Sequence, residues 1–112
     1  MTPTLEAVLG NRSAVQVLLF LEAYESGHAS RIASTFDVPV NGIQRQLKRL
    51  EASGVVVSHF VGRTRVFEFN TRNPTVRNLR TFLEVELESL PDSTTQAYFR
   101  QRQRPRRTGK DL

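Results

Sequence analysis

At 112 residues the chain is long enough to form one modest hydrophobic core and too short to form two. It has no cysteine, which excludes disulfides, cysteine-based zinc sites and thiol chemistry, and its two histidines have no metal-ligand spacing. The formal net charge of +5 is unevenly placed: residues 31–80 carry nine Lys or Arg and three Asp or Glu, and residues 91–112 carry six and two. A basic middle of this kind is typical of a protein that binds a polyanion.

The apolar segments are short. The N-terminus lacks a basic-then-apolar signal pattern, and the longest apolar run extends only from Val17 to Leu21. Because neither export nor a membrane span is supported, we expect a cytoplasmic protein that does not contact a membrane.

Two helices are predicted at the N-terminal end. The first begins at Thr2-Pro3, with a hydroxyl cap and a proline in the first turn, and ends at Gly10. The second is capped by Asn11, runs to about Ser26 and stops at Gly27. This second helix is apolar on almost every side, which indicates burial on several sides and suggests that a partner covers one of them.

Residues 29–54 have the pattern of two helices joined by a tight turn. A short helix to Phe36 is followed by the turn Asp37-Val38-Pro39 and by a second helix over about residues 40–52, which Gly54 closes. Aliphatic residues at helical spacing give these segments a compact apolar cluster: Ile32, Ala33, Val38, Ile43, Leu47 and Leu50.

A β-hairpin and a long helix come next. Residues 55–69 are rich in β-branched and aromatic residues on either side of Gly62-Arg63-Thr64, which predicts a hairpin with a basic tip. Asn73-Pro74 then opens a helix that continues to Leu90. We therefore expect one domain over residues 1–91 and a basic, mostly disordered tail over residues 92–112, whose removal leaves the fold intact.

In this order of elements, the sequence resembles the winged helix-turn-helix of bacterial ArsR-like and MarR-like transcriptional regulators. The resemblance is carried by RIASTFDVPVNGIQRQLKRLEASGVV and by GRTRVFEFN, and it extends over roughly residues 8–90. It implies a mainly α fold with a small β-hairpin, namely four to five helices plus a two- or three-stranded wing, in a DNA-binding homodimer. Two departures stand out: Asp37 occupies a turn position where such motifs often carry glycine, and the cysteines of the metal-sensing branch are absent.

The helix at residues 40–52 has one polar face that fits DNA. Its exposed residues are Asn41, Gln44, Arg45, Lys48 and Arg49. Because Arg, Asn and Gln match the edges of guanine and adenine in the major groove, we expect the first three to read bases and the last two to meet phosphate. The wing, residues 55–69, would place Arg63, Thr64 and Arg65 on the minor groove or the backbone.

A homodimer is expected because a palindromic DNA site requires a two-fold protein. The last helix divides into two apolar surfaces, one for the domain's own core and one for a second subunit. The predicted dimer contacts come from this helix and from the buried helix before residue 27: Leu18, Leu21, Leu79, Phe82, Leu83 and Leu87.

The sequence thus predicts a sequence-specific regulator that binds double-stranded DNA, and its small size favours repression by occlusion. The alternatives are a winged-helix protein-interaction module and the DNA-binding partner of a toxin–antitoxin pair. No nucleophile with its base, paired-carboxylate site or glycine-rich phosphate loop is present, so we expect no enzyme, no metal and no cofactor. Two questions stay open: whether Tyr24, His28 and His59 line a small effector pocket, and whether the arginines of the tail only solubilise the chain or add sequence-independent affinity for DNA.

Overall fold

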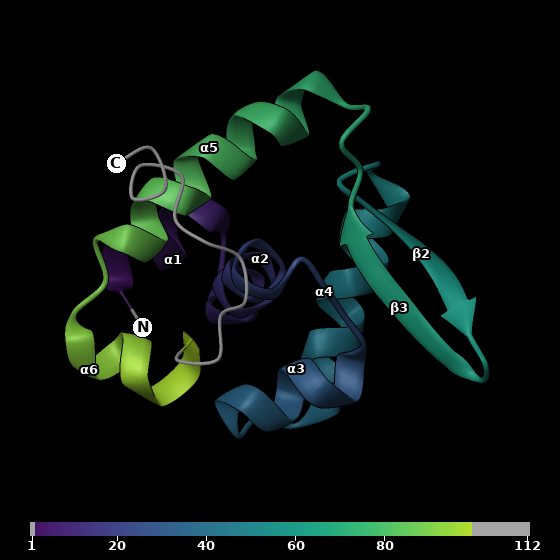
Figure 1. The fold of residues 1–112 in the computed structure, drawn as a ribbon, viewed down its shortest axis with the longest axis horizontal. Coiled ribbons are helices and arrows are strands. Elements are labelled where there is room, and N and C mark those ends of the chain that lie inside the picture. Colours follow the sequence, from purple (N-terminus) through teal and green to yellow (C-terminus); the bar gives the residue numbers. More distant parts are fainter. Residues whose placement is uncertain (1, 100–112) are drawn as a thin grey trace, which may run out of the picture.

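The computed structural model describes residues 2–99, which fold into six α-helices and a small antiparallel sheet (Figure 1). The predicted mainly α architecture with a β-hairpin is confirmed. The sheet has three strands, as the predicted two- or three-stranded wing allows, and there is one α-helix more than the four to five predicted. In chain order the elements are α1 (Pro3–Leu9), α2 (Arg12–Tyr24), β1 (Ser26–Gly27), α3 (Ala29–Phe36), α4 (Val40–Ala52), β2 (Val56–Val61), β3 (Thr64–Phe69), α5 (Pro74–Glu88), α6 (Asp92–Thr94) and a π-helical turn (Thr95–Phe99).

Side-chain caps define the starts of two helices as the sequence predicts. The Oδ1 atom of Asn11 accepts a hydrogen bond from the backbone N–H of Ala14 at 2.8 Å, and Oδ1 of Asn73 accepts one from Thr75 at 3.0 Å. These bonds satisfy helix N–H groups that have no partner within the helix. The predicted hydroxyl cap at Thr2 is wrong, because its side chain makes no capping hydrogen bond.

Helix α2 is the centre of the molecule. Every residue from Ala14 to Ala23 is buried, and the helix is packed against α1, α3, α4, α5 and β1. The chain itself therefore encloses the helix, and the expectation that a partner covers one of its sides is wrong. A buried ion pair ties it to α5, since Nε of Arg80 lies 3.0 Å from Oε1 of Glu22, which has no exposed surface.

The sheet has three strands in the order β1-β3-β2. Helix α2 ends at Tyr24, two residues earlier than expected, because Ser26 and Gly27 pair with Glu68 and Phe67 of the hairpin. A Cβ atom at Gly27 would stand 2.5 Å from Cε1 of Phe20, so only glycine fits between this strand and α2.

The turn between α3 and α4 tolerates its aspartate. Asp37 adopts the left-handed conformation, with φ 55° and ψ 51°, in which Asp and Asn are enriched. Its backbone N–H donates to the carbonyl of Ser34, and that of Val38 donates to the carbonyl of Ala33. The predicted helix-turn-helix connection therefore forms without glycine.

The predicted boundary of the tail at residue 92 is wrong. Residues 92–99 form α6 and the π-helical turn, and Phe99 is only 3% exposed within the main core. The aromatic rings of Tyr98 and Phe99 find partners on α2 and α3, which compensates for the low apolar content of this segment. The rest of the predicted tail, residues 100–112, lies outside the described residues.

The two apolar surfaces predicted for α5 are present, but they are divided differently from the expectation. Leu83 and Leu87 are buried in the chain's own core, as are Leu18 and Leu21 of α2, so in this structure these four side chains have little surface to offer a second subunit. Leu79 is half-buried. The exposed surface of α5 instead carries Phe82 at 40% and Val85 at 55% exposure. Dimerisation itself remains a prediction.

Candidate nucleic-acid interface

Helix α4 separates its apolar and polar side chains as the helical period predicts. Ile43, Leu47 and Leu50 are buried against α2, whereas the five residues expected to contact DNA are all exposed: Asn41, Gln44, Arg45, Lys48 and Arg49. The core thus holds α4 by one face and leaves a continuous surface of amide, guanidinium and ammonium groups facing outward.

These polar groups line two adjoining hollows. A shallow one of about 320 Å³ is lined by Asn41, Gln44, Arg45 and Lys48. A larger groove of about 540 Å³ runs between α4, the hairpin and the beginning of α3, and it shares Gln44 and Lys48 with the first. Its other lining residues are His28, Ala29, Ser30, Leu47, Glu51, Arg63, Thr64, Arg65 and Phe67.

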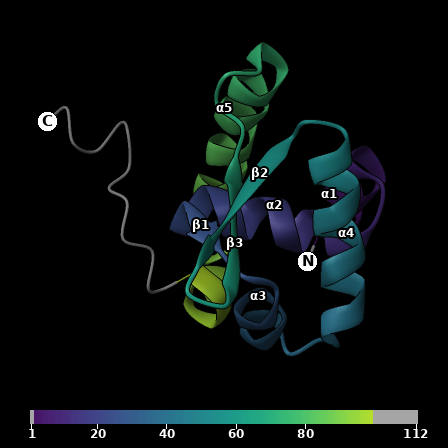
Figure 2. The same ribbon diagram turned by 90° about the vertical axis from the view of Figure 1, so that its right-hand side faces the viewer.

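The fold therefore brings seven of the eight predicted DNA-binding residues to one connected surface, although they come from two segments of the sequence. In Figure 2 the hairpin faces the viewer, with α4 on one side of it and α3 below. The exception is Arg49, which lies outside both hollows and whose Nε donates to Oε1 of Gln46 at 3.0 Å.

Arg65 has an internal role that the sequence did not indicate. Its Nη2 lies 3.0 Å from Oε1 of Glu51, and its Nε donates to Oγ of Ser58, which in turn donates to Oε2 of Glu51 at 2.6 Å. The guanidinium also lies over the rings of Phe60 and Phe67, 5.8 and 5.6 Å from their centroids. This set of contacts, the Glu51–Ser58–Arg65 brace, connects the hairpin to the last turn of α4.

The brace also changes the electrostatics of the groove. Glu51 is the only carboxylate among the groove's lining residues, and its ion pair with Arg65 compensates the negative charge. Lys48 and Arg63 then give the groove a net positive charge, and Arg45 adds to it in the neighbouring hollow. A surface of this kind attracts phosphate.

Sequence reasoning missed two residues at the start of α3. The Nδ1 atom of His28 accepts a hydrogen bond from the backbone N–H of Arg31 at 3.3 Å, so the imidazole caps the helix. Ser30, in the first turn, is exposed and lines the same groove as Lys48. A hydroxyl beside the N-terminal end of a helix is suited to contact a phosphate. No local pattern marks these residues, since only the packing of α3 on α4 brings them to the groove.

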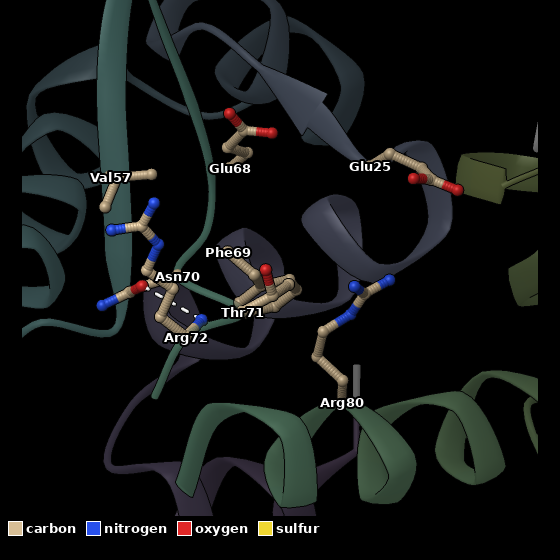
Figure 3. A pocket seen from close by; sticks show the side chains of 8 residues that line it. All are labelled: Glu25, Val57, Glu68, Phe69, Asn70, Thr71, Arg72 and Arg80. Atoms are coloured by element: carbon tan, nitrogen blue, oxygen red, sulfur yellow. Dashed lines mark hydrogen bonds between the residues drawn. The ribbon is translucent and has the colours of Figure 1, made fainter. Parts of the chain in front are cut away.

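A separate cavity of about 640 Å³ lies behind the hairpin, between β2, β3, the end of α2 and α5 (Figure 3). Its lining mixes carboxylates and guanidinium groups: Glu25, Val57, Glu68, Phe69, Asn70, Thr71, Arg72 and Arg80. None of the three residues suggested for an effector pocket lines this cavity. Tyr24 instead hydrogen bonds through Oη to the carbonyl of Tyr98, His28 caps α3, and Nδ1 of His59 lies 3.8 Å from Oε2 of Glu68.

Within residues 2–99, no group of three or more His, Cys, Asp or Glu side chains is arranged to hold a metal ion. No helix in that part of the chain has the length and the apolar character needed to cross a membrane.

The fold is that of winged-helix transcriptional regulators. A protein from E. coli described as a predicted DNA-binding transcriptional regulator is similar with a TM-score of 0.58 and 14% identity, over 72% of this chain and 83% of its own. The AntR antimony-specific transcriptional repressor has a TM-score of 0.58 and 18% identity, over 76% and 75%. A MarR family transcriptional regulator from Silicibacter pomeroyi has a TM-score of 0.59 and 20% identity, over 77% of this chain and 61% of its own.

At these low identities the structural similarity establishes the fold alone, and the function has to be argued from the site. No protein-family model and no curated protein sequence matches the chain. The connected surface described above lies on α4 and on the hairpin of this fold.

Proposed function

We propose that the protein is a transcriptional regulator that binds double-stranded DNA sequence-specifically, with α4 in the major groove and the hairpin on the neighbouring backbone or minor groove. The observation that supports this most strongly is the surface on which Asn41, Gln44, Arg45 and Lys48 meet Arg63 and Thr64. Asn, Gln and Arg are the side chains that match base edges, and the basic groups around them match phosphate.

Within this proposal the residues have separate roles. Asn41, Gln44 and Arg45, in the first half of α4, read bases. Lys48 and Arg63 neutralise phosphates, Thr64 hydrogen bonds to the backbone, and Arg65 holds the hairpin against α4 through Glu51. Arg49 makes at most a contact to the flanking backbone, because it lies outside both hollows.

We further propose that the regulator acts as a homodimer and represses by occluding DNA. The exposed Phe82 and Val85, with the half-buried Leu79 along the same side of α5, supply an apolar surface for the second subunit. A two-fold dimer would present two copies of α4 to half-sites about 34–36 Å apart, or a multiple of this distance. Phe82→Glu combined with Val85→Glu should give a folded monomer in analytical ultracentrifugation. If the wild-type protein is monomeric at micromolar concentration, the dimer proposal is contradicted and the DNA-binding proposal is not.

The alternative is a winged helix that binds another protein. The residues of α4 argue against it, because its exposed face is polar and basic, whereas a protein-binding face is expected to be apolar or acidic. The DNA-binding partner of a toxin–antitoxin pair is a special case of the DNA-binding proposal, and a stable complex with a second protein would distinguish it.

The test of DNA binding is selection of a preferred sequence from random duplexes by the purified full chain, followed by titration of selected and random DNA. Arg45→Ala should cost about 1–3 kcal/mol on the selected sequence and relax the preference at one base pair. Arg77→Ala is the matched control, since Arg77 is an exposed arginine on α5, away from the groove. Failure to recover any preferred sequence, with equal small effects of both substitutions, would leave protein binding as the better explanation.

A further inference from the structure

Phe60 is the most exposed large hydrophobic side chain in residues 2–99, with 66% of its surface accessible to solvent. It lies on β2, two residues before Gly62 at the turn of the hairpin, and the hairpin projects away from the helices (Figure 1). At a rise of about 3.3 Å per residue, Phe60 stands about 13 Å along the strand from Val56. The ring is therefore carried out beyond the helices and does not cover the core.

The strand register places Phe60 on the side of the hairpin that faces the groove. Phe60 pairs with Arg65 across the hairpin, and residues directly opposite each other in an antiparallel pair share one face. Arg65 and Phe67 on this face line the groove beside α4. The neighbouring Val61 points to the opposite face, because successive side chains of a strand alternate. Phe60 thus extends the surface of the groove toward the tip of the hairpin.

The ring of Phe60 is held in place by the guanidinium of Arg65. This guanidinium lies 5.8 Å from the centroid of Phe60 and 5.6 Å from that of Phe67, and Glu51 fixes it through an ion pair of 3.0 Å. A cation over an aromatic face is attracted by the ring. The ring is therefore oriented before anything binds to it, which lowers the entropy that binding would cost.

The surroundings of Phe60 do not resemble a docking surface for a protein. Such a surface is a continuous apolar patch. On the groove face of the hairpin the neighbours of Phe60 are Ser58 and Arg65, and Phe67 is only 8% exposed. Phe60 is thus a single exposed aromatic ring among polar and basic groups.

The charges next to the ring favour DNA. The turn beside Phe60 carries Arg63 and Thr64, whereas Glu68, the only carboxylate of residues 56–69, pairs with Val57 near the other end of the hairpin. Arginines are attracted by the negative potential of the minor groove. Proteins that bind this groove frequently insert one apolar side chain between two base pairs, with basic and polar residues beside it.

We propose that Phe60 is an apolar wedge, which enters the minor groove beside the sequence that α4 reads and partly unstacks one base step. This rests on the proposed function. An inserted wedge bends the duplex toward the major groove by about 20–90°. Because TA and CA steps unstack and kink more easily than other steps, the wedge makes the protein prefer such a step without a hydrogen bond to a base. Phe60 is then a specificity-determining residue.

The first test measures this preference with three variants of the full chain. Phe60→Ala removes the wedge, and Phe60→Leu keeps an apolar one. Val61→Ala is the matched control, since Val61 is 61% exposed on the opposite face. Replacement of the TA or CA step in a selected sequence by AA should weaken binding about ten-fold for wild type, Phe60→Leu and Val61→Ala. It should leave the affinity of Phe60→Ala nearly unchanged.

The second test observes the deformation itself. A fluorescent adenine analogue placed at the step becomes brighter when it is unstacked, and energy transfer between dyes at the two DNA ends reports the bend. Both signals should appear with wild type, Phe60→Leu and Val61→Ala, with a bend of at least about 20°. Both should be lost with Phe60→Ala, while its melting temperature stays close to that of wild type.

The outcomes separate the wedge from the regulator. Specific binding by Phe60→Ala with the bend and the step preference retained overturns the wedge and leaves the regulator standing. A change in the oligomeric state of Phe60→Ala without DNA, measured by sedimentation, also overturns it, because the ring then belongs to a protein interface. If the wild type selects no sequence but bends random DNA through Phe60, the wedge is supported and sequence-specific regulation is overturned.

Discussion

Replacement of Phe99 by alanine should destabilise the whole domain, although the residue lies in a segment that composition alone assigns to a disordered tail. Its ring is 3% exposed and contacts the rings of Tyr24, Phe36 and Tyr98. Removal of a buried phenylalanine side chain costs about 3–5 kcal/mol in protein cores. The cost is smaller where neighbouring side chains can collapse into the cavity, and we expect a value near the lower end, about 3 kcal/mol.

This loss is large for a domain of this size. Single domains have free energies of unfolding of about 5–15 kcal/mol. In a domain of about 100 residues, each kcal/mol lowers the melting temperature by about 4–8 °C, so Phe99→Ala should lower it by more than about 10 °C. Calorimetry or thermal unfolding followed by circular dichroism measures this directly.

Two controls isolate the contribution of Phe99 and of the segment that carries it. Phe60→Ala removes a ring that is 66% exposed, so its effect on the melting temperature should be small. A chain truncated after Pro91 should lose at least as much stability as Phe99→Ala. If truncation after Pro91 leaves the melting temperature within a few degrees of wild type, residues 92–99 do not dock and the reasoning about Phe99 is refuted.

Two further predictions concern the brace and the strand β1. Glu51→Gln removes the ion pair with Arg65. It should weaken binding to a selected DNA sequence several-fold, while the melting temperature changes by only a few degrees. A loss of stability without a loss of affinity would contradict the role of the brace in positioning the hairpin. Gly27→Ala should cost about 1–3 kcal/mol, because its Cβ would stand 2.5 Å from the ring of Phe20, and an unchanged denaturant midpoint would show that β1 can move away from α2.

The sequence by itself determined the features that depend on neighbours along the chain. The apolar period of residues 40–52 predicted which side of α4 is buried, and Asn11 and Asn73 marked the starts of two helices through caps that span only two or three residues. The turn at Gly62 and the alternation on both sides of it predicted the hairpin. Each of these signals is local, because helix faces, caps and tight turns are set by residues a few positions apart.

Tertiary structure decided whatever depends on residues that are distant in sequence. The hydrogen bond from Tyr24 to Tyr98 joins positions 74 residues apart, and no composition or period reveals that an aromatic pair after Pro91 will find a place on α3. Arg65 has the sequence context of a free wing residue, and only the approach of Glu51 converts it into a brace. In the same way, α2 is covered by its own chain and Leu83 is turned inward, because the packing of helices decides which of several apolar faces is buried in the core.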